Sequence, residues 1–73
     1  MEEILIKNKL VQLRKEKRIK QQQLADMLGV SRQTIGSLEN GRYNPSITLA
    51  FKIARFFGCS IEDVFLYEEE NVQ

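Results

Sequence analysis

Residues 21–40 of the chain read Gln-Gln-Gln-Leu-Ala-Asp-Met-Leu-Gly-Val-Ser-Arg-Gln-Thr-Ile-Gly-Ser-Leu-Glu-Asn. The spacing of the apolar residues predicts two short helices, over 21–28 and 32–39, hinged at 29–31. Ser31 precedes the second helix and can accept hydrogen bonds from its free N–H groups. Lys20 precedes the 21–28 helix and cannot accept such hydrogen bonds, so that helix should begin without a side-chain cap. The rest of the chain is expected to pack around these two helices.

Three residues of this stretch suit a helix-turn-helix motif. Ala25 is small enough for close contact between the two helices, Gly29 allows the tight turn, and the β-branched Ile35 anchors the second helix. At about 100° per residue, Thr34, Ile35 and Leu38 lie on one side of the second helix. We therefore expect these three residues to be buried and the opposite arc to face solvent.

The opposite arc carries Arg32, Gln33, Gly36 and Ser37. Arginine can bond guanine at N7 and O6, and glutamine can bond adenine at N6 and N7, so Arg32 and Gln33 are candidate base-reading residues for a DNA major groove. Gly36 costs the helix about 1 kcal/mol relative to alanine. Either it lets DNA approach closely or leaves room for a thymine methyl group, or it is a tolerated surface glycine. The sequence leaves both readings open.

Polar residues around this surface are candidates for contacts with DNA phosphates, which position a protein without reading bases. They are Lys20, Gln21, Asn40 and Arg42. For Gln21 the alternative is an ordinary solvated side chain, because the two residues that follow it are also glutamine. Arg14 and Glu39 each lie close to the expected buried side of their helix, so they form either an ion pair between helices or two unrelated surface charges.

Length and composition bound the class of protein. Seventy-three residues, 42% hydrophobic and 29% charged, predict a single folded domain over residues 1–73 whose small core would gain stability from dimerisation. No apolar run approaches the roughly 18 residues of a membrane span, and the acidic start is unlike a signal peptide, so we expect a cytoplasmic protein. With one cysteine and no histidine, we expect no metal site, no cofactor and no enzymatic activity.

The net charge of +1 conceals a segregation of charge along the chain. Residues 7–20 contain seven basic residues and one acid, whereas residues 58–73 contain five acids and no basic residue. Such an arrangement can hold DNA phosphates on one surface while the acidic end points away from it or toward a partner subunit. The short chain leaves no evident site for a small-molecule effector.

Apolar spacing and stop signals outline the other elements. They predict a first helix from about residue 7 to near residue 18, a fourth capped by Ser46 and stopped by Gly58, and a short last helix beginning at Ser60. Cys59 is expected to pack as a small apolar residue. Residues 4–6 are too short to classify and are consistent with a short strand, and residues 65–67 are consistent with a frayed helix or a second short strand.

Taken together, these motifs resemble the phage repressor and Cro family of helix-turn-helix regulators over residues 9–65, nearly the whole chain. The resemblance rests on Leu24-Ala25, Leu28-Gly29-Val30-Ser31-Arg32-Gln33-Thr34-Ile35, Leu38-Glu39-Asn40-Gly41, Asn44-Pro45-Ser46, Ile53-Ala54, Phe57-Gly58 and Ile61-Glu62-Asp63-Val64-Phe65. It implies an all-α, five-helix domain that binds operator DNA as a homodimer, with the 32–39 helix in the major groove. Some single-domain members of the family also pair their termini as two antiparallel strands, which here would join residues 4–7 with 66–68.

The resemblance also assigns roles to residues. It implies base reading by Arg32, Gln33 and Ser37, a phosphate contact by Gln21 and a loop contact by Asn40. It implies a buried ion pair between Arg14 and Glu39 as well. The chain departs from the family pattern at Lys20, where a capping threonine is usual, and at Gly36 and Ser37, where larger polar residues are common.

We therefore expect a sequence-specific regulator that binds double-stranded DNA, most simply a repressor on a near-palindromic operator. The alternative is an antitoxin-like or other protein-interaction module for which DNA binding is secondary.

Overall fold

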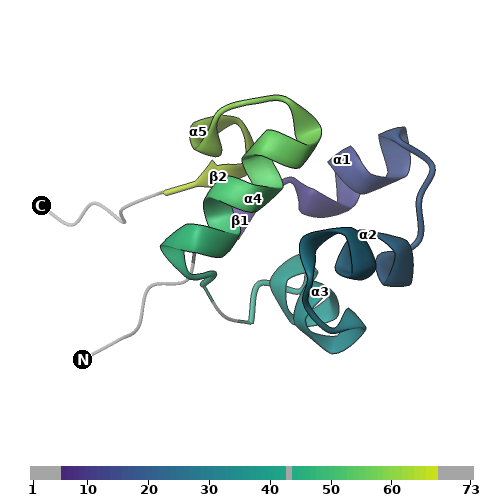
Figure 1. Ribbon diagram of the computed structural model, residues 1–73. Helices are drawn as coiled ribbons and strands as arrows, with labels where there is room; N and C mark the ends of the chain where they lie inside the picture. Colours follow the sequence, from purple (N-terminus) through teal and green to yellow (C-terminus); the bar gives the residue numbers. More distant parts are fainter. Residues whose placement is uncertain (1–5, 43, 68–73) are drawn as a thin grey trace, which may run out of the picture.

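The computed structural model describes residues 6–42 and 44–67. Its helices are α1 (Leu10–Glu16), α2 (Gln21–Leu28), α3 (Arg32–Glu39), α4 (Ile47–Phe57) and α5 (Ile61–Val64), and its two strands are β1 (Lys7–Asn8) and β2 (Phe65–Leu66). In Figure 1, α1, α2 and α3 lie on one side of the molecule, and α5 and the strands lie on the other. Within the described part of the chain, none of the helices has the length and apolar character needed to cross a membrane.

The α2 and α3 helices have the bounds that the sequence predicts. Gly29 ends α2 with a φ of 74°, a left-handed conformation that glycine adopts without strain. Ser31 caps α3, since its side chain accepts a hydrogen bond of 3.1 Å from the N–H group of Thr34. Lys20 provides no side-chain cap for α2, and instead its own N–H group donates to Oε1 of Gln23 at 2.7 Å.

Serine caps also begin the last two helices, as predicted. The side chain of Ser46 accepts a hydrogen bond from the N–H group of Leu49 at the start of α4. At the start of α5, Ser60 and Asp63 form a reciprocal capping box. The hydrogen bonds that Asp63 receives from the backbone and side chain of Ser60 hold the pKa of its carboxyl group below the usual range.

The first helix is shorter than predicted. It begins at Leu10 instead of near residue 7 and ends at Glu16 instead of near Arg18. At its start, the Asn8 side chain accepts a 2.9 Å hydrogen bond from the N–H group of Leu10. At its end, Arg18 has a φ of 59°, which is incompatible with a continuing right-handed helix.

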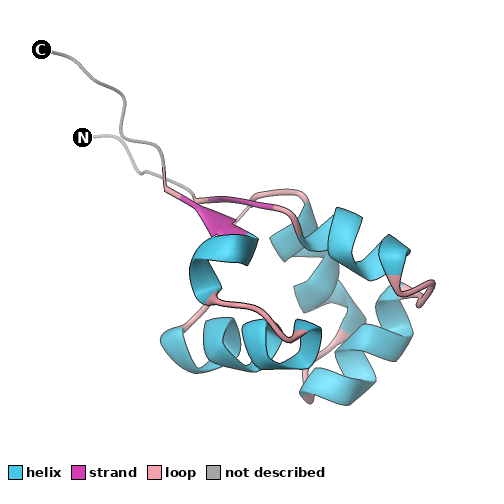
Figure 2. Cartoon of the chain, turned by 90° about the horizontal axis from the view of Figure 1, so that it is seen from above, coloured by secondary structure: helices cyan, strands magenta, loops and turns pink. Residues whose placement is uncertain are grey.

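The antiparallel strand pair that the resemblance implies is present, but its position along the chain differs. Lys7 pairs with Leu66 and Asn8 pairs with Phe65, so β1 extends into the segment predicted as helix. Residues 4, 5 and 68 of the predicted strands lie outside the described residues. Figure 2 shows the strands together at one end of the molecule, beside the short α5 helix.

The hydrophobic core draws on all five helices and on β2. Fully buried side chains come from each helix, namely Leu10, Leu24, Ile35, Leu38, Ile53 and Val64. Thr34, predicted to be buried, is only half-buried, because its hydroxyl group lies 3.0 Å from that of Ser31 at the helix start. Cys59 packs against the core as expected.

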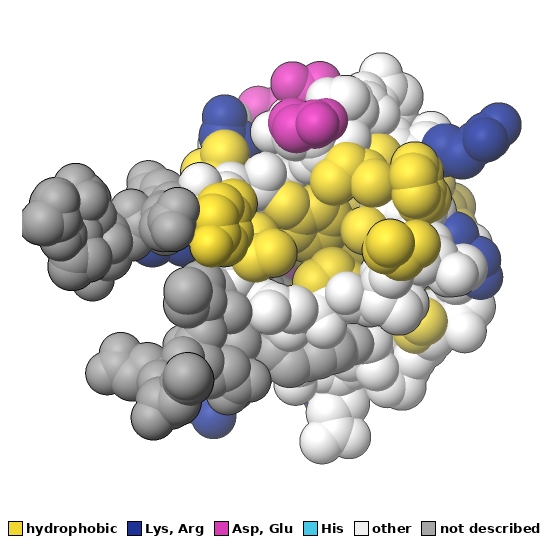
Figure 3. All heavy atoms as spheres, turned by 90° about the vertical axis from the view of Figure 1, so that its left-hand side faces the viewer, with side chains coloured by type: hydrophobic (Ala, Val, Ile, Leu, Met, Phe, Trp, Pro, Cys, Tyr) yellow, Lys and Arg dark blue, Asp and Glu magenta, His cyan; other side chains and the backbone are white. Residues whose placement is uncertain are grey.

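Apolar side chains also remain exposed. Ile47 and Phe51, one turn apart on α4, are 74% and 54% exposed, and Tyr67 is 60% exposed. A hollow of about 390 Å³ lies between α4 and α5, lined by Phe51, Ala54, Cys59 and Ile61 together with Arg55, Ser60 and Glu62. Figure 3 shows apolar side chains gathered over this side of the molecule. We call Ile47, Phe51, Ala54 and Ile61 the α4–α5 face.

Arg14 and Glu39 form an ion pair between α1 and α3. Nε of Arg14 lies 2.6 Å from Oε2 of Glu39, and Nη2 donates to Oε1 at 3.2 Å. The third nitrogen, Nη1, donates to the carbonyl oxygen of Ile19 at 2.9 Å. The two side chains are only 13% and 5% exposed, so the pair is largely removed from water. This pair fixes the first helix and the chain that follows it to the end of α3.

Replacing Arg14 with methionine is expected to lower the free energy of unfolding by about 3–5 kcal/mol, because the Glu39 carboxylate stays buried without its cation. Replacing both Arg14 and Glu39 with methionine should cost less than either single change. Glu16→Ala, which removes the exposed 3.3 Å hydrogen bond from Gln12 on the same helix, is the control and should change stability by less than about 0.5 kcal/mol. Urea unfolding of the four variants measures these differences, and a double variant less stable than both singles would contradict the expectation.

Candidate nucleic-acid interface

The exposed arc of α3 is the side predicted for base reading. Because Ile35 and Leu38 are buried in the core, Arg32 and Gln33 are directed to solvent at the start of the helix. Further along the same arc, Gly36 and Ser37 are half-buried. The angular prediction therefore agrees with the exposure of Arg32 and Gln33, whereas Gly36 and Ser37 are less exposed than predicted.

This arc forms a shallow concavity with the loop that follows it. The concavity has a volume of about 290 Å³ and is lined by Arg32, Gln33, Gly36, Ser37, Asn40 and Arg42. All three candidate base readers and two of the four candidate phosphate contacts thus lie together. Two of the lining residues are arginines and none is acidic, so the surface is positively charged and rich in hydrogen-bond donors.

The other two candidates, Lys20 and Gln21, lie at the start of α2. Lys20 is exposed, and neither residue lines the concavity. Gln21 is connected to it nonetheless, because its Oε1 accepts a 3.3 Å hydrogen bond from Nη1 of Arg32. The start of α2 therefore borders the surface formed by α3.

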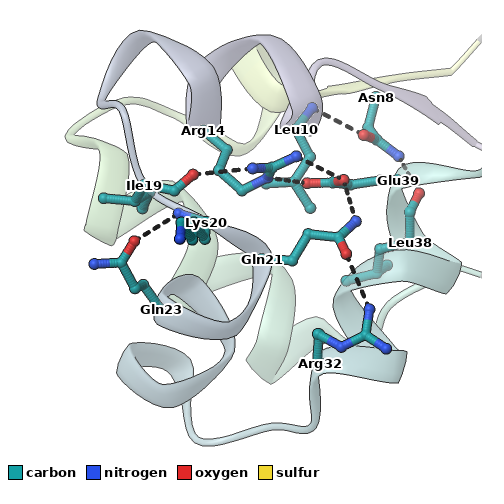
Figure 4. A network of polar contacts seen from close by, with 10 residues as sticks. All are labelled: Asn8, Leu10, Arg14, Ile19, Lys20, Gln21, Gln23, Arg32, Leu38 and Glu39. Atoms are coloured by element: carbon teal, nitrogen blue, oxygen red, sulfur yellow. Dashed lines mark hydrogen bonds and ion pairs between the residues drawn. The ribbon is translucent and has the colours of Figure 1, made fainter.

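Gln21 also joins this surface to the buried ion pair, as Figure 4 shows. Its Nε2 donates to Oε1 of Glu39 at 2.8 Å, while Oε1 faces Arg32. A carboxylate accepts hydrogen bonds and donates none, so Glu39 determines which way the Gln21 amide points. The result is a continuous chain of polar contacts from Arg14 through Glu39 and Gln21 to Arg32.

Two of these contacts were not predicted from the sequence. The bonds from Gln21 to Glu39 and Arg32 carry no local signal, since three successive glutamines look alike before folding. Asn8 was also missed, and its Nδ2 donates to the carbonyl oxygen of Leu38 near the end of α3 at 2.9 Å. An asparagine two residues before an apolar helical run is a recognisable start signal, and it could have located the first helix.

The side chains of this surface are suited to binding a partner through hydrogen bonds. Arginine, glutamine, asparagine and serine side chains offer hydrogen bonds at fixed positions on one helix and its following loop. Among residues 6–42 and 44–67, no group of three histidine, cysteine, aspartate or glutamate side chains could hold a metal ion. The arrangement suits a polyanion whose base edges carry hydrogen-bond acceptors.

Comparison with known proteins agrees with this geometry. A family model described as helix-turn-helix matches residues 10–64. An uncharacterised HTH-type transcriptional regulator of Methanocaldococcus jannaschii is 55% identical over 66 residues, which cover 90% of this chain and all of the relative. An uncharacterised HTH-type transcriptional regulator of Bacillus subtilis is 46% identical, again over 90% of this chain and all of the relative.

Among solved structures, the restriction-modification controller protein C.AhdI of Aeromonas hydrophila superposes with a TM-score of 0.68 at 30% identity. The match covers 74% of this chain and 82% of the controller. Family model, relatives and structure agree with the arrangement of α2, the Gly29 turn and α3. The chain belongs to the helix-turn-helix family of DNA-binding transcriptional regulators, of the phage repressor and Cro type.

Proposed function

We propose that the protein represses transcription by binding a near-palindromic operator as a homodimer, with α3 of each subunit in the major groove. The observation that carries this proposal is the concavity on α3, where Arg32, Gln33 and Ser37 lie side by side without an acidic residue. A dimer bound to such an operator would cover a promoter and block transcription by occupying the DNA, without catalysis. Arg32 and Gln33 read base edges at the start of α3, and Ser37 adds a contact one turn later.

Phosphate contacts surround this reading surface. Asn40 and Arg42 follow α3 and face the same concavity, while Lys20 is exposed at the start of α2. Such contacts set the position of α3 on the duplex and contribute equally on every sequence. Their positive charge also makes binding depend steeply on salt.

Gln21 has two roles in this proposal. Its NH₂ group carries two hydrogens, of which Glu39 takes one, so the other is available for a phosphate oxygen. Its Oε1 holds the guanidinium group of Arg32 at the edge of the concavity. An arginine held in place loses less rotational freedom on binding a guanine than a free one, which raises affinity for the correct base.

The α4–α5 face supports the proposal of a homodimer. It places exposed Phe51 beside Ile61, with exposed Ile47 one turn earlier on α4, on a different side of the molecule from α3. Arg55 and Glu62, of opposite charge, lie at the edge of its hollow, so two copies related by a two-fold axis can pair an arginine with a glutamate at each end. A dimer of this kind presents two α3 helices to half-sites about 34 Å apart.

Equilibrium binding to the DNA upstream of the protein's own gene tests the function. Fluorescence anisotropy at moderate salt should give an affinity at least about a thousandfold greater for a site in this DNA than for random duplex. A site selected from random sequences serves the same purpose where the protein does not regulate itself. Equal affinity for all duplexes would refute sequence-specific regulation.

Arg32→Ala is expected to cost about 1–3 kcal/mol on the specific site and to relax the preference at one base pair, because it removes a bidentate contact with guanine. Lys20→Ala is the matched control and should weaken specific and random DNA alike, with a smaller salt dependence. Gln21→Ala should weaken binding to all duplexes and also relax the preference at the base pair that Arg32 reads. Competition binding with all four base pairs at each position measures them, and a uniform loss for Arg32→Ala would remove its reading role.

Phe51→Glu is expected to convert a dimer to a monomer, because it places a charge in the centre of an apolar contact. Met27→Glu, at a methionine that is 62% exposed on α2, is the control and should leave the dimer intact. Sedimentation equilibrium at tens of micromolar distinguishes the two. Phe51→Glu should also bind a full operator more weakly while retaining its affinity for an isolated half-site, and a monomeric parent protein would contradict the dimer.

A further inference from the structure

Gly36 lies in the middle of α3, where a glycine is unfavourable. Within a helix it lowers stability by comparison with alanine, because its backbone is freer in the unfolded chain. Gly29, Gly41 and Gly58 all have positive φ angles, so their backbone conformations favour glycine. Gly36 does not belong to this group, and its helical backbone would accept any ordinary residue. The backbone therefore does not explain this glycine.

Packing within the protein does not explain Gly36 either. A Cβ atom built at this position meets no heavy atom within 4 Å among the described residues beyond its own helix backbone and neighbours. The buried contacts of α3 are made by Ile35 and Leu38, which lie on the other side. An alanine at position 36 would therefore fit the folded chain and strengthen the helix. The described fold therefore gives no reason for a glycine at position 36.

Gly36 is one of the residues that line the concavity of about 290 Å³. The others, Arg32, Gln33, Ser37, Asn40 and Arg42, all carry polar side chains, so Gly36 leaves a small apolar gap among hydrogen-bonding groups. In a major groove nearly all groups at the base edges are donors or acceptors, and the thymine C5-methyl group is the apolar exception. A methyl group loses nothing by facing a Cα atom, whereas a donor or acceptor placed there would lose its partner.

We propose that Gly36 is a specificity-determining position, and that its missing side chain forms a notch for the methyl group of one thymine in each half-site. The inference rests on the proposed binding of α3 in the major groove. It names a base, thymine, in addition to those read by hydrogen bonds. A Cβ atom at position 36 would occupy the space that the methyl group needs.

The test combines a protein change with a DNA change. Each thymine of the operator half-site is replaced in turn by deoxyuridine, which lacks only the methyl group, and affinity is measured by anisotropy for the parent protein and for Gly36→Ala. At one position the parent should lose about fourfold per half-site, the value of one buried methyl group. Gly36→Ala should bind the thymine operator at least about tenfold more weakly and should no longer distinguish thymine from uracil there.

Two controls separate this effect from a change in folding. Gly36→Ala should melt about 4–8 °C higher than the parent, since the helix gains the propensity of alanine. Ser37→Ala, the adjacent residue on the same arc, should retain the sensitivity to uracil at the same position. Weaker DNA binding by a more stable protein would then be due to the lost notch.

The outcomes distinguish this inference from the proposed function. If the parent protein prefers no DNA sequence, the proposed function fails and the notch fails with it. If the parent is specific but Gly36→Ala binds equally well, or if both proteins respond equally to uracil, the notch alone is refuted. A lower melting temperature for Gly36→Ala would also overturn the inference, because the fold itself would then require the glycine.

Discussion

The buried carboxylate of Glu39 is the constraint on which the arrangement of the first three helices depends. Its side chain is only 5% exposed, and a charge so far removed from water needs partners. Arg14 supplies one from α1 and Gln21 supplies another from the start of α2. One acceptor at the end of α3 therefore holds three helices at one point. In a domain of this size, such a polar contact complements a small apolar core.

The Arg14 side chain also contacts the connection between α1 and α2. Between α1 and α2 the chain turns at Arg18, whose positive φ is uncommon for a residue other than glycine. The guanidinium group of Arg14 donates to the carbonyl oxygen of Ile19, directly after this turn. Arg14 thus anchors the connection to the same site that positions α3. Arg14 therefore contacts both the end of α3 and the loop between α1 and α2.

Local signals were sufficient to predict most of the fold, and the errors have both local and long-range causes. Ser31, Ser46 and Ser60 cap helices as their positions predict, because capping involves only the next three residues. The first helix was predicted to start too early, because residues 7 and 8 pair with a strand more than fifty residues away and because the start signal at Asn8 was not recognised. The exposed arc of α3 followed from helical geometry. The orientation of Gln21 did not, because it requires the position of Glu39 in the folded chain.

The side chains of Gln33 and Ser37 form no hydrogen bonds with the residues that the structure describes, and neither belongs to the core. These two side chains therefore contribute little to the stability of the fold. Substitutions at positions 33 and 37 should therefore leave the fold intact. The domain is thus suited to a library of engineered repressors that differ at these two positions. Arg32 is the exception, because it is hydrogen-bonded to Gln21. A substitution at position 32 therefore also removes a hydrogen bond from Gln21.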